Sequence, residues 1–188
     1  MYKPKKHGAS FFVFFGFYLK FLQRFALIFC LIIKPDRSLE ISKRKETQIM
    51  KKTVLITGAS GGIGGEICRI FAENGFDVIA QYNSGEEEIT ALKNETQKNF
   101  GISFFPVHAD LSKSEDVDLL AKKALSFSKN IDVLVNNAGV SLRGIFQLIG
   151  EAEAKKLLSV NLESAMNLTR KVLPSMIARK AGKIVNIS

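Results

Sequence analysis

A glycine-rich turn between an apolar run and an amphipathic segment constrains the fold of this 188-residue chain most strongly. The run T-V-L-I-T at residues 53–57 predicts a buried strand, and the apolar spacing from about Ile63 predicts a helix. Such a junction directs backbone N–H groups and a helix dipole at one point, where a phosphate can bind. The spacing G-x-x-x-G-x-G at Gly58, Gly62 and Gly64 differs from the commoner G-x-G-x-x-G. A tight turn without a ligand is the alternative interpretation.

Strands and helices are expected to alternate after this turn. The first helix is expected to end at Asn74-Gly75, a common helix stop, and glutamates 86–88 suit the first turn of the next helix. Further strands are expected at 78–82, 103–107, 133–135 and 183–187, and further helices at about 114–126 and 151–179, the last with a kink at Pro174. This order predicts an α/β fold, a Rossmann-type doubly wound parallel sheet with strands one to five and helices on both faces.

Ligands of such sheets bind beyond the carboxyl ends of the strands, at the point where the strand order reverses. Three groups of residues are expected to meet there: the glycine turn, Asp110-Leu111 after the third strand, and the run 136–139, N-N-A-G, after the fourth. Each group also has a structural alternative. Asp110 can serve as a helix N-cap, and Asn136 can bind strand-end backbone.

The charge of the chain excludes one class of function. The formal charge of +9 divides into +7 over residues 1–50 and +2 over residues 51–188. A nearly neutral body without a basic stripe predicts no nucleic-acid binding. The two histidines lack companions at metal-ligand spacing, so no metal site is expected, and Cys68 is expected to be a buried apolar residue in a reducing compartment.

Residues 1–49 differ in composition from the rest of the chain. The apolar stretch 11–33 exceeds the roughly 20 residues that a transmembrane helix needs. Lys20 and Arg24 interrupt this stretch and would lie on one face of a helix. Each would raise the free energy of membrane insertion by about 3 kcal/mol near the bilayer centre. The favoured interpretation is that Met50 starts the mature protein and that 1–49 is a leader or non-native extension. A membrane anchor through 11–33 is the alternative.

Four motifs together resemble the short-chain dehydrogenase/reductase family over residues 52–188. They are T-G-x-x-x-G-I-G at 57–64, N-N-A-G at 136–139, V-N-L at 160–162 and the closing G-K-I-V-N-I-S at 182–188. The resemblance implies an NAD(P)-dependent oxidoreductase that transfers a hydride to a small or carrier-bound carbonyl substrate. Within the family, the chain is most similar to 3-oxoacyl-acyl-carrier-protein reductases of fatty acid biosynthesis. The end of the long helix and the last strand also resemble elongation factor P 5-aminopentanone reductases.

The resemblance also implies roles for individual residues. The pyrophosphate and its ribose are assigned to Gly58, Ser60, Gly61, Ile63 and Gly64. The adenine is assigned to Asp110 and Leu111, and the nicotinamide-side ribose to Asn137, Ala138 and Gly139.

Asn161 is assigned to a water in the proton relay. From the residues alone, Asn161 falls on an apolar face near Leu157, Leu158 and Leu162, where an amide needs hydrogen-bond partners. A side-chain-to-backbone bond or a helix kink is therefore the alternative.

The expected cofactor is NADP, with NAD as the alternative. An acidic residue near the end of the second strand would bind the ribose 2′-OH of NAD. Asp77 has the usual separation from Gly58 but precedes the expected strand, whose other end carries no carboxylate. Asn83 and Ser84 are the expected contacts of the 2′-phosphate.

The serine, tyrosine and lysine that family members use for catalysis are not found in the region of resemblance. The one Y-x-x-x-K match is Tyr2 with Lys6, and Ser188 aligns with the residue before the catalytic serine. We therefore expect a C-terminally truncated, inactive form of a cytoplasmic reductase that is a homotetramer when intact. A non-catalytic dinucleotide-binding module is the alternative.

Overall fold

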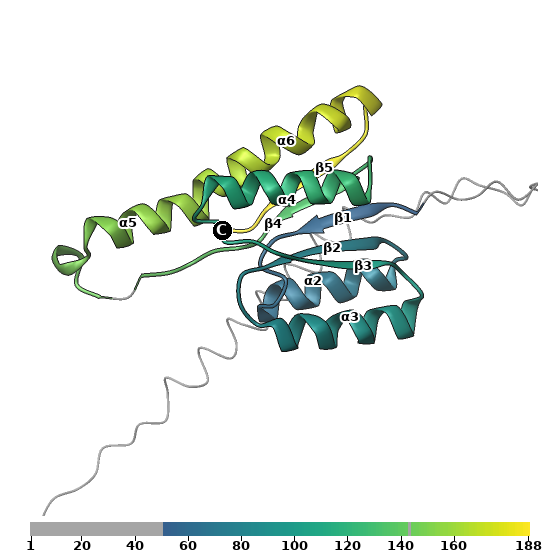
Figure 1. Ribbon diagram of the computed structural model, residues 1–188, viewed down its shortest axis with the longest axis horizontal. Helices are drawn as coiled ribbons and strands as arrows, with labels where there is room; N and C mark the ends of the chain where they lie inside the picture. The colour runs from purple at the N-terminus through teal and green to yellow at the C-terminus, as the bar shows by residue number, and fades with distance from the viewer. Residues whose placement is uncertain (1–50, 143) are drawn as a thin grey trace, which may run out of the picture. The chain divides into compact units, whose positions relative to one another are not determined.

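The computed structural model describes residues 51–142 and 144–188, which form a five-stranded parallel sheet (Figure 1). The strands are β1 (Thr53–Ile56), β2 (Asp77–Tyr82), β3 (Phe104–His108), β4 (Val133–Asn136) and β5 (Lys183–Asn186). Their spatial order is β3-β2-β1-β4-β5, and all four strand pairs are parallel. The predicted Rossmann-type fold is confirmed. The strand order reverses between β1 and β4, which is where such sheets bind ligands.

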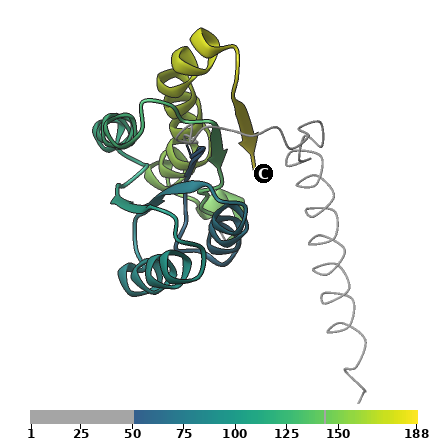
Figure 2. The same ribbon diagram turned by 90° about the vertical axis from the view of Figure 1, so that its right-hand side faces the viewer.

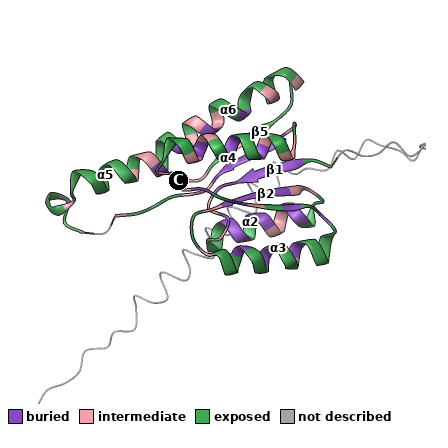
Figure 3. Ribbon diagram, viewed as in Figure 1, coloured by how far each residue is buried: buried purple, intermediate pink, exposed green. Residues whose placement is uncertain are grey.

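Two layers of helices cover the sheet. The helices α2 (Gly62–Glu73) and α3 (Glu86–Phe100) lie on one face, and α4 (Ser114–Phe127) and α6 (Ser164–Arg179) lie on the other (Figures 1 and 2). Between β4 and α6 come a short 3₁₀ turn η1 (Phe146–Leu148), helix α5 (Glu151–Leu158) and a π-helical turn η2 (Ser159–Glu163). No residue of α5 is buried, so this helix contributes nothing to the core (Figure 3).

The core has two halves, because successive side chains of each strand point to opposite faces of the sheet and helices cover both faces. All four residues of β1 are buried, as expected for a central parallel strand. Leu55 belongs to a cluster with Leu120 of α4 and Leu168 of α6. Successive strand residues face opposite sides, so Val54 and Ile56 face the α2–α3 layer.

Cys68 confirms the expectation of a buried apolar residue. Its side chain is fully buried within α2, and burial raises the pKa of the thiol to about 12. The thiol is therefore protonated and unreactive in the folded protein at neutral pH.

The predicted element boundaries agree with the structure to within one residue at every strand end and to within two residues at the ends of α2 and α4. Gly75 has φ +77° after α2, as a glycine helix stop requires, and the three glutamates occupy the first turn of α3. One placement was wrong: Asp77 is the first residue of β2 and does not precede it. The π turn η2 was not predicted, and α6 continues through Pro174 to Arg179.

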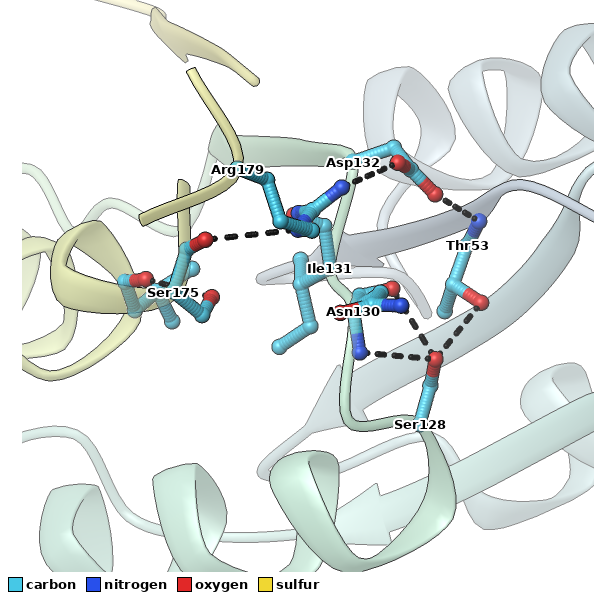
Figure 4. Close-up of polar contacts among 8 residues, drawn as sticks. Thr53, Ser128, Asn130, Ile131, Asp132, Ser175 and Arg179 are labelled. Atoms are coloured by element: carbon cyan, nitrogen blue, oxygen red, sulfur yellow. Dashed lines mark hydrogen bonds and ion pairs between the residues drawn. The ribbon is translucent and has the colours of Figure 1, made fainter. Parts of the chain in front are cut away.

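A polar cluster ties α6 to the amino ends of the strands (Figure 4). The Asp132 carboxylate accepts hydrogen bonds from the Thr53 backbone N–H at 2.8 Å and from Arg179 Nη1 at 2.9 Å. Arg179 Nη2 also donates to the Ile131 carbonyl oxygen at 2.9 Å, and Thr53 Oγ1 donates to Ser128 Oγ at 3.1 Å. The cluster therefore holds β1, β4, α4 and α6 together at the amino ends of the strands, away from the carboxyl ends where such sheets bind ligands.

None of the helices that the structure describes between residues 51 and 188 is long and apolar enough to cross a membrane. The stretch 11–33, for which a membrane anchor is the alternative interpretation, lies outside the described residues, as does the expected leader 1–49.

Candidate functional site

A cavity of about 430 Å³ lies at the carboxyl ends of the strands. All residues that the sequence assigns to the cofactor line it: Gly58, Ser60, Gly61, Ile63, Gly64, Asn83, Asp110, Leu111, Asn137, Ala138 and Gly139. Ser84, the second expected phosphate contact, lines it as well. Gly62 of the glycine turn is also part of the wall, and residues that were not predicted complete it: Gln81, Val140, Lys156 and Val160. The three sequence groups thus meet at one place, as the rule for parallel sheets predicts.

The glycine turn is shaped by close backbone packing. Gly58 has φ +66°, and a Cβ added there would lie 2.9 Å from Ala138 Cα. A Cβ added at Gly64 would overlap the Gly58 carbonyl oxygen and lie 2.8 Å from Asn137 Nδ2. These two glycines are therefore required by the packing of the turn against the N-N-A-G segment, whereas a Cβ at Gly62 would meet nothing within 4 Å.

Thr57 joins the glycine turn to the N-N-A-G segment. Its buried hydroxyl oxygen accepts hydrogen bonds from the backbone N–H groups of Asn137 at 3.0 Å and Ala138 at 2.9 Å. A further hydrogen bond joins the same two segments, because Asn137 Nδ2 donates to the Thr57 carbonyl oxygen at 2.9 Å. Thr57 had no predicted role, although a polar residue at the end of an apolar strand run is a signal that could have identified it.

Asn136 has a structural role, but its side chain bonds to two other side chains and not, as the alternative interpretation holds, to strand-end backbone. Its side chain is buried, and Nδ2 donates to Asn186 Oδ1 at 2.8 Å and to Thr169 Oγ1 at 3.3 Å. These bonds connect β4 with β5 and α6. Asn136 does not line the cavity, whereas Asn137, Ala138 and Gly139 do. The first asparagine of the motif therefore stabilises the strand ends.

Asp110 lies at the end of β3 in a local turn. Its Oδ1 accepts hydrogen bonds from the Ser112 backbone N–H at 3.0 Å and the Ser112 hydroxyl at 2.7 Å. These bonds, with smaller contributions from the positive charges of Lys113 and Lys156, hold the pKa of the Asp110 carboxyl below its usual value. The alternative that Asp110 caps the following helix is wrong, because the N-cap residue of α4 is Lys113.

The lowered pKa of Asp110 predicts a pH-dependent contribution to stability. A carboxyl whose pKa is lower in the folded than in the unfolded chain stabilises the fold above the unfolded value of about 4, and the contribution disappears as pH falls through the folded pKa. The Asp110→Asn variant is therefore expected to be less stable than the unsubstituted chain at pH 6, with a smaller difference at pH 3. Urea unfolding at both pH values measures this; a difference that does not change with pH would contradict it.

Asn161 lies at the centre of η2 and binds the loop that follows Gly139. Its Nδ2 donates to the Val140 carbonyl oxygen and its Oδ1 accepts from the Val140 N–H, both at 2.8 Å. The side-chain-to-backbone alternative is thus present in the structure, within a π turn of the kind frequent at functional sites. The premise of a buried apolar face was wrong, because Asn161 is exposed and Leu158 and Leu162 are 51% and 53% exposed. The role in a proton relay stays a prediction.

Charged groups are few in the cavity. Asp110 and Lys156 are the charged side chains among its lining residues. Asp77 lies at the opposite end of β2, where its Oδ1 accepts a hydrogen bond from the Ser103 N–H at 2.7 Å. The carboxyl end of β2 therefore presents Asn83 and Ser84 to the cavity without a carboxylate, and the described residues contain no group that could hold a metal ion.

A parallel sheet with a glycine turn and a helix N-terminus at its switch point defines a dinucleotide-binding fold of the Rossmann class. The sequence matches the family described as short chain dehydrogenase over residues 52–188. The chain belongs to the short-chain dehydrogenase/reductase family.

Similar proteins agree with this assignment. The 3-oxoacyl-acyl-carrier-protein reductase FabG of Staphylococcus epidermidis is 32% identical over 139 residues, which are 74% of this chain and 57% of that protein. A metagenomic short-chain oxidoreductase in complex with NADP has 36% identity and a TM-score of 0.69, over 73% of this chain and 61% of the other. A short-chain dehydrogenase from Sphingobium yanoikuyae in complex with NADPH has 30% identity and a TM-score of 0.68, over 73% and 53%. The chain thus spans little more than half the length of these relatives.

Proposed function

We propose that this chain binds NADP(H) in the cavity at the carboxyl ends of β1–β4 and forms the cofactor-binding part of a carbonyl reductase. The observation that carries the proposal is the meeting of the glycine turn, Asp110-Leu111 and Asn137–Gly139 around one cavity. The turn and the α2 N-terminus are suited to the pyrophosphate, and Asp110 can accept a hydrogen bond from the adenine amino group. Bound NADPH would supply the hydride.

NADP is proposed over NAD because none of the cavity-lining residues at the carboxyl end of β2 carries a carboxylate that could bind the ribose 2′-OH of NAD. Ser60, Asn83 and Ser84 line this part of the cavity and offer neutral hydrogen-bond donors to a 2′-phosphate. The solved relatives that hold NADP or NADPH support the same choice. NAD is the alternative cofactor.

The proposed substrate is a carbonyl compound such as a 3-oxoacyl thioester, with a 5-aminopentanone-type ketone as a further candidate. The similarity to FabG supports the first, and with it a cytoplasmic role in fatty acid biosynthesis. Asn161 is the proposed catalytic contact, through a water molecule of the proton relay. Because Tyr82 is followed at the fourth residue by Glu86, residues 51–188 contain no tyrosine–lysine pair at catalytic spacing. We propose that the chain by itself binds the cofactor without reducing a carbonyl.

A homotetramer is proposed for the intact protein. The α5–η2–α6 segment exposes Leu158, Leu162, Met166, Leu173 and Ile177, which recur at spacings of four or seven residues and together form an apolar stripe. Apolar stripes of this kind commonly pack against another subunit, and the stripe is the surface that supports self-association.

Titration of the purified chain with NADPH and NADH tests the cofactor proposal. We expect NADPH to bind with a dissociation constant at least about tenfold lower than that of NADH, a difference of about 1.4 kcal/mol. Equal or tighter binding of NADH would overturn the choice of cofactor, and no binding of either would overturn the proposed function. Oxidation of NADPH in the presence of an acetoacetyl thioester tests the second part. We expect no rate above that without protein, and a clear rate would contradict the proposed lack of catalysis.

A further inference from the structure

We propose that Gln81 is a positioning residue of the cofactor site, one that holds the glycine turn in the shape required to bind the pyrophosphate. This inference rests on the proposed binding of NADP(H). Gln81 is the fifth residue of β2, lines the cavity, and is only 1% exposed. A buried side-chain amide is destabilising unless its donor and acceptor both have partners, so its contacts indicate what it does.

The Gln81 amide connects the ends of three strands. Its Oε1 accepts a hydrogen bond from the Gly58 N–H at 2.9 Å, and its Nε2 donates to the Ala109 carbonyl oxygen at 2.7 Å. Its own backbone carbonyl oxygen accepts from the Ala59 N–H at 2.8 Å. Gly58 can only donate and Ala109 can only accept through these groups, so the orientation of the amide is unique.

These contacts hold both the glycine turn and the segment that contains Asp110. Gly58 is the residue whose positive φ starts the glycine turn, and its carbonyl oxygen accepts from the Gly61 N–H at 3.2 Å. Ala109 directly precedes Asp110, which is proposed to bind the adenine. One neutral amide therefore sets the pyrophosphate turn and the adenine contact relative to each other. A leucine would provide neither bond, and a carboxylate would keep the bond from Gly58 but repel the Ala109 carbonyl oxygen.

The first test compares the Gln81→Leu variant with a matched control, Thr96→Val. Thr96 is a fully buried residue of α3 whose hydroxyl donates to the Leu92 carbonyl oxygen at 2.8 Å, and it does not line the cavity. Both variants remove a buried hydrogen-bonding group and are expected to lower the urea midpoint. Only Gln81→Leu is expected to raise the dissociation constant for NADP⁺, by about tenfold or more. Equal dissociation constants for Gln81→Leu and the unsubstituted chain would overturn the inference.

The Gln81→Glu variant supplies a readout that loss of packing would not change, and it remains informative if Gln81→Leu does not fold. Its carboxyl has nearly the shape of the amide, and only the protonated form can donate to Ala109. We expect the ratio of its dissociation constant for NADP⁺ to that of the unsubstituted chain to fall between pH 8 and pH 5.5. The nearby charged or titratable side chains, those of Asp110, Lys156 and His108, occur in both proteins, so the ratio removes the pH dependence that the two proteins share.

The two proposals fail in different ways. If the unsubstituted chain does not bind NADP⁺, the proposed function fails. If it binds NADP⁺ and the ratio for Gln81→Glu stays constant with pH, the cofactor site stands and the positioning role of Gln81 is wrong.

Discussion

Replacement of Gly64 by alanine is expected to abolish NADP(H) binding and to lower the free energy of unfolding by about 3 kcal/mol. The added methyl group would overlap the carbonyl oxygen of Gly58 and lie 2.8 Å from Asn137 Nδ2. The turn cannot yield easily, because Gly58 itself packs against the backbone of Ala138. Relief of the overlap must therefore displace the backbone that is proposed to bind the pyrophosphate. Urea unfolding and titration with NADPH measure the two effects.

Gly62→Ala is the matched control for this prediction. Gly62 is the first residue of α2 in the same turn, and a Cβ at this position would have no neighbour within 4 Å. Because alanine favours a helix over glycine by up to about 1 kcal/mol, Gly62→Ala is expected to leave stability unchanged or slightly increased. Equal destabilisation by the two substitutions would contradict the steric explanation and indicate a general requirement for glycine in this turn.

The location of the site could be predicted from the sequence because two short-range patterns determine it. Alternating strands and helices predict a parallel sheet, and the carboxyl ends of parallel strands meet at one edge. Residues that lie one or two positions after a strand, such as Gly58, Asp110 and Asn137, could therefore be assigned to the cavity without knowledge of their contacts.

The unpredicted residues depend on contacts between distant parts of the chain. Gln81 bonds to Gly58 and Ala109, which are 23 and 28 residues away, and these bonds depend on the register of β1, β2 and β3. Lys156 of α5 and Val160 of η2 line the cavity, which no local sequence pattern indicates. Asn161 was identified by its motif, but the expectation that it lies on a buried face was wrong. Helical periodicity shows where an apolar face lies, but not whether another part of the protein covers it.

Thr57→Val is expected to lower the free energy of unfolding by about 3 kcal/mol and to weaken NADP(H) binding. Valine has nearly the shape of threonine, so the buried volume is retained. The substitution removes the buried acceptor of two backbone N–H groups, those of Asn137 and Ala138, which are themselves half-buried. Each donor left without a partner contributes roughly 1–3 kcal/mol. The N-N-A-G segment is then expected to move away from the glycine turn, which opens the ribose side of the cavity.

Thr57→Ser separates the hydroxyl from the methyl group. Serine keeps the acceptor for both N–H groups and loses one buried methyl, which destabilises by about 1 kcal/mol. A purely apolar contribution of Thr57 predicts the opposite order, with valine more stable than serine. Urea unfolding of the three proteins decides between these orders, and NADPH titration shows whether binding follows the hydroxyl. If Thr57→Val is as stable as the unsubstituted chain, the two hydrogen bonds do not hold the N-N-A-G segment against the glycine turn.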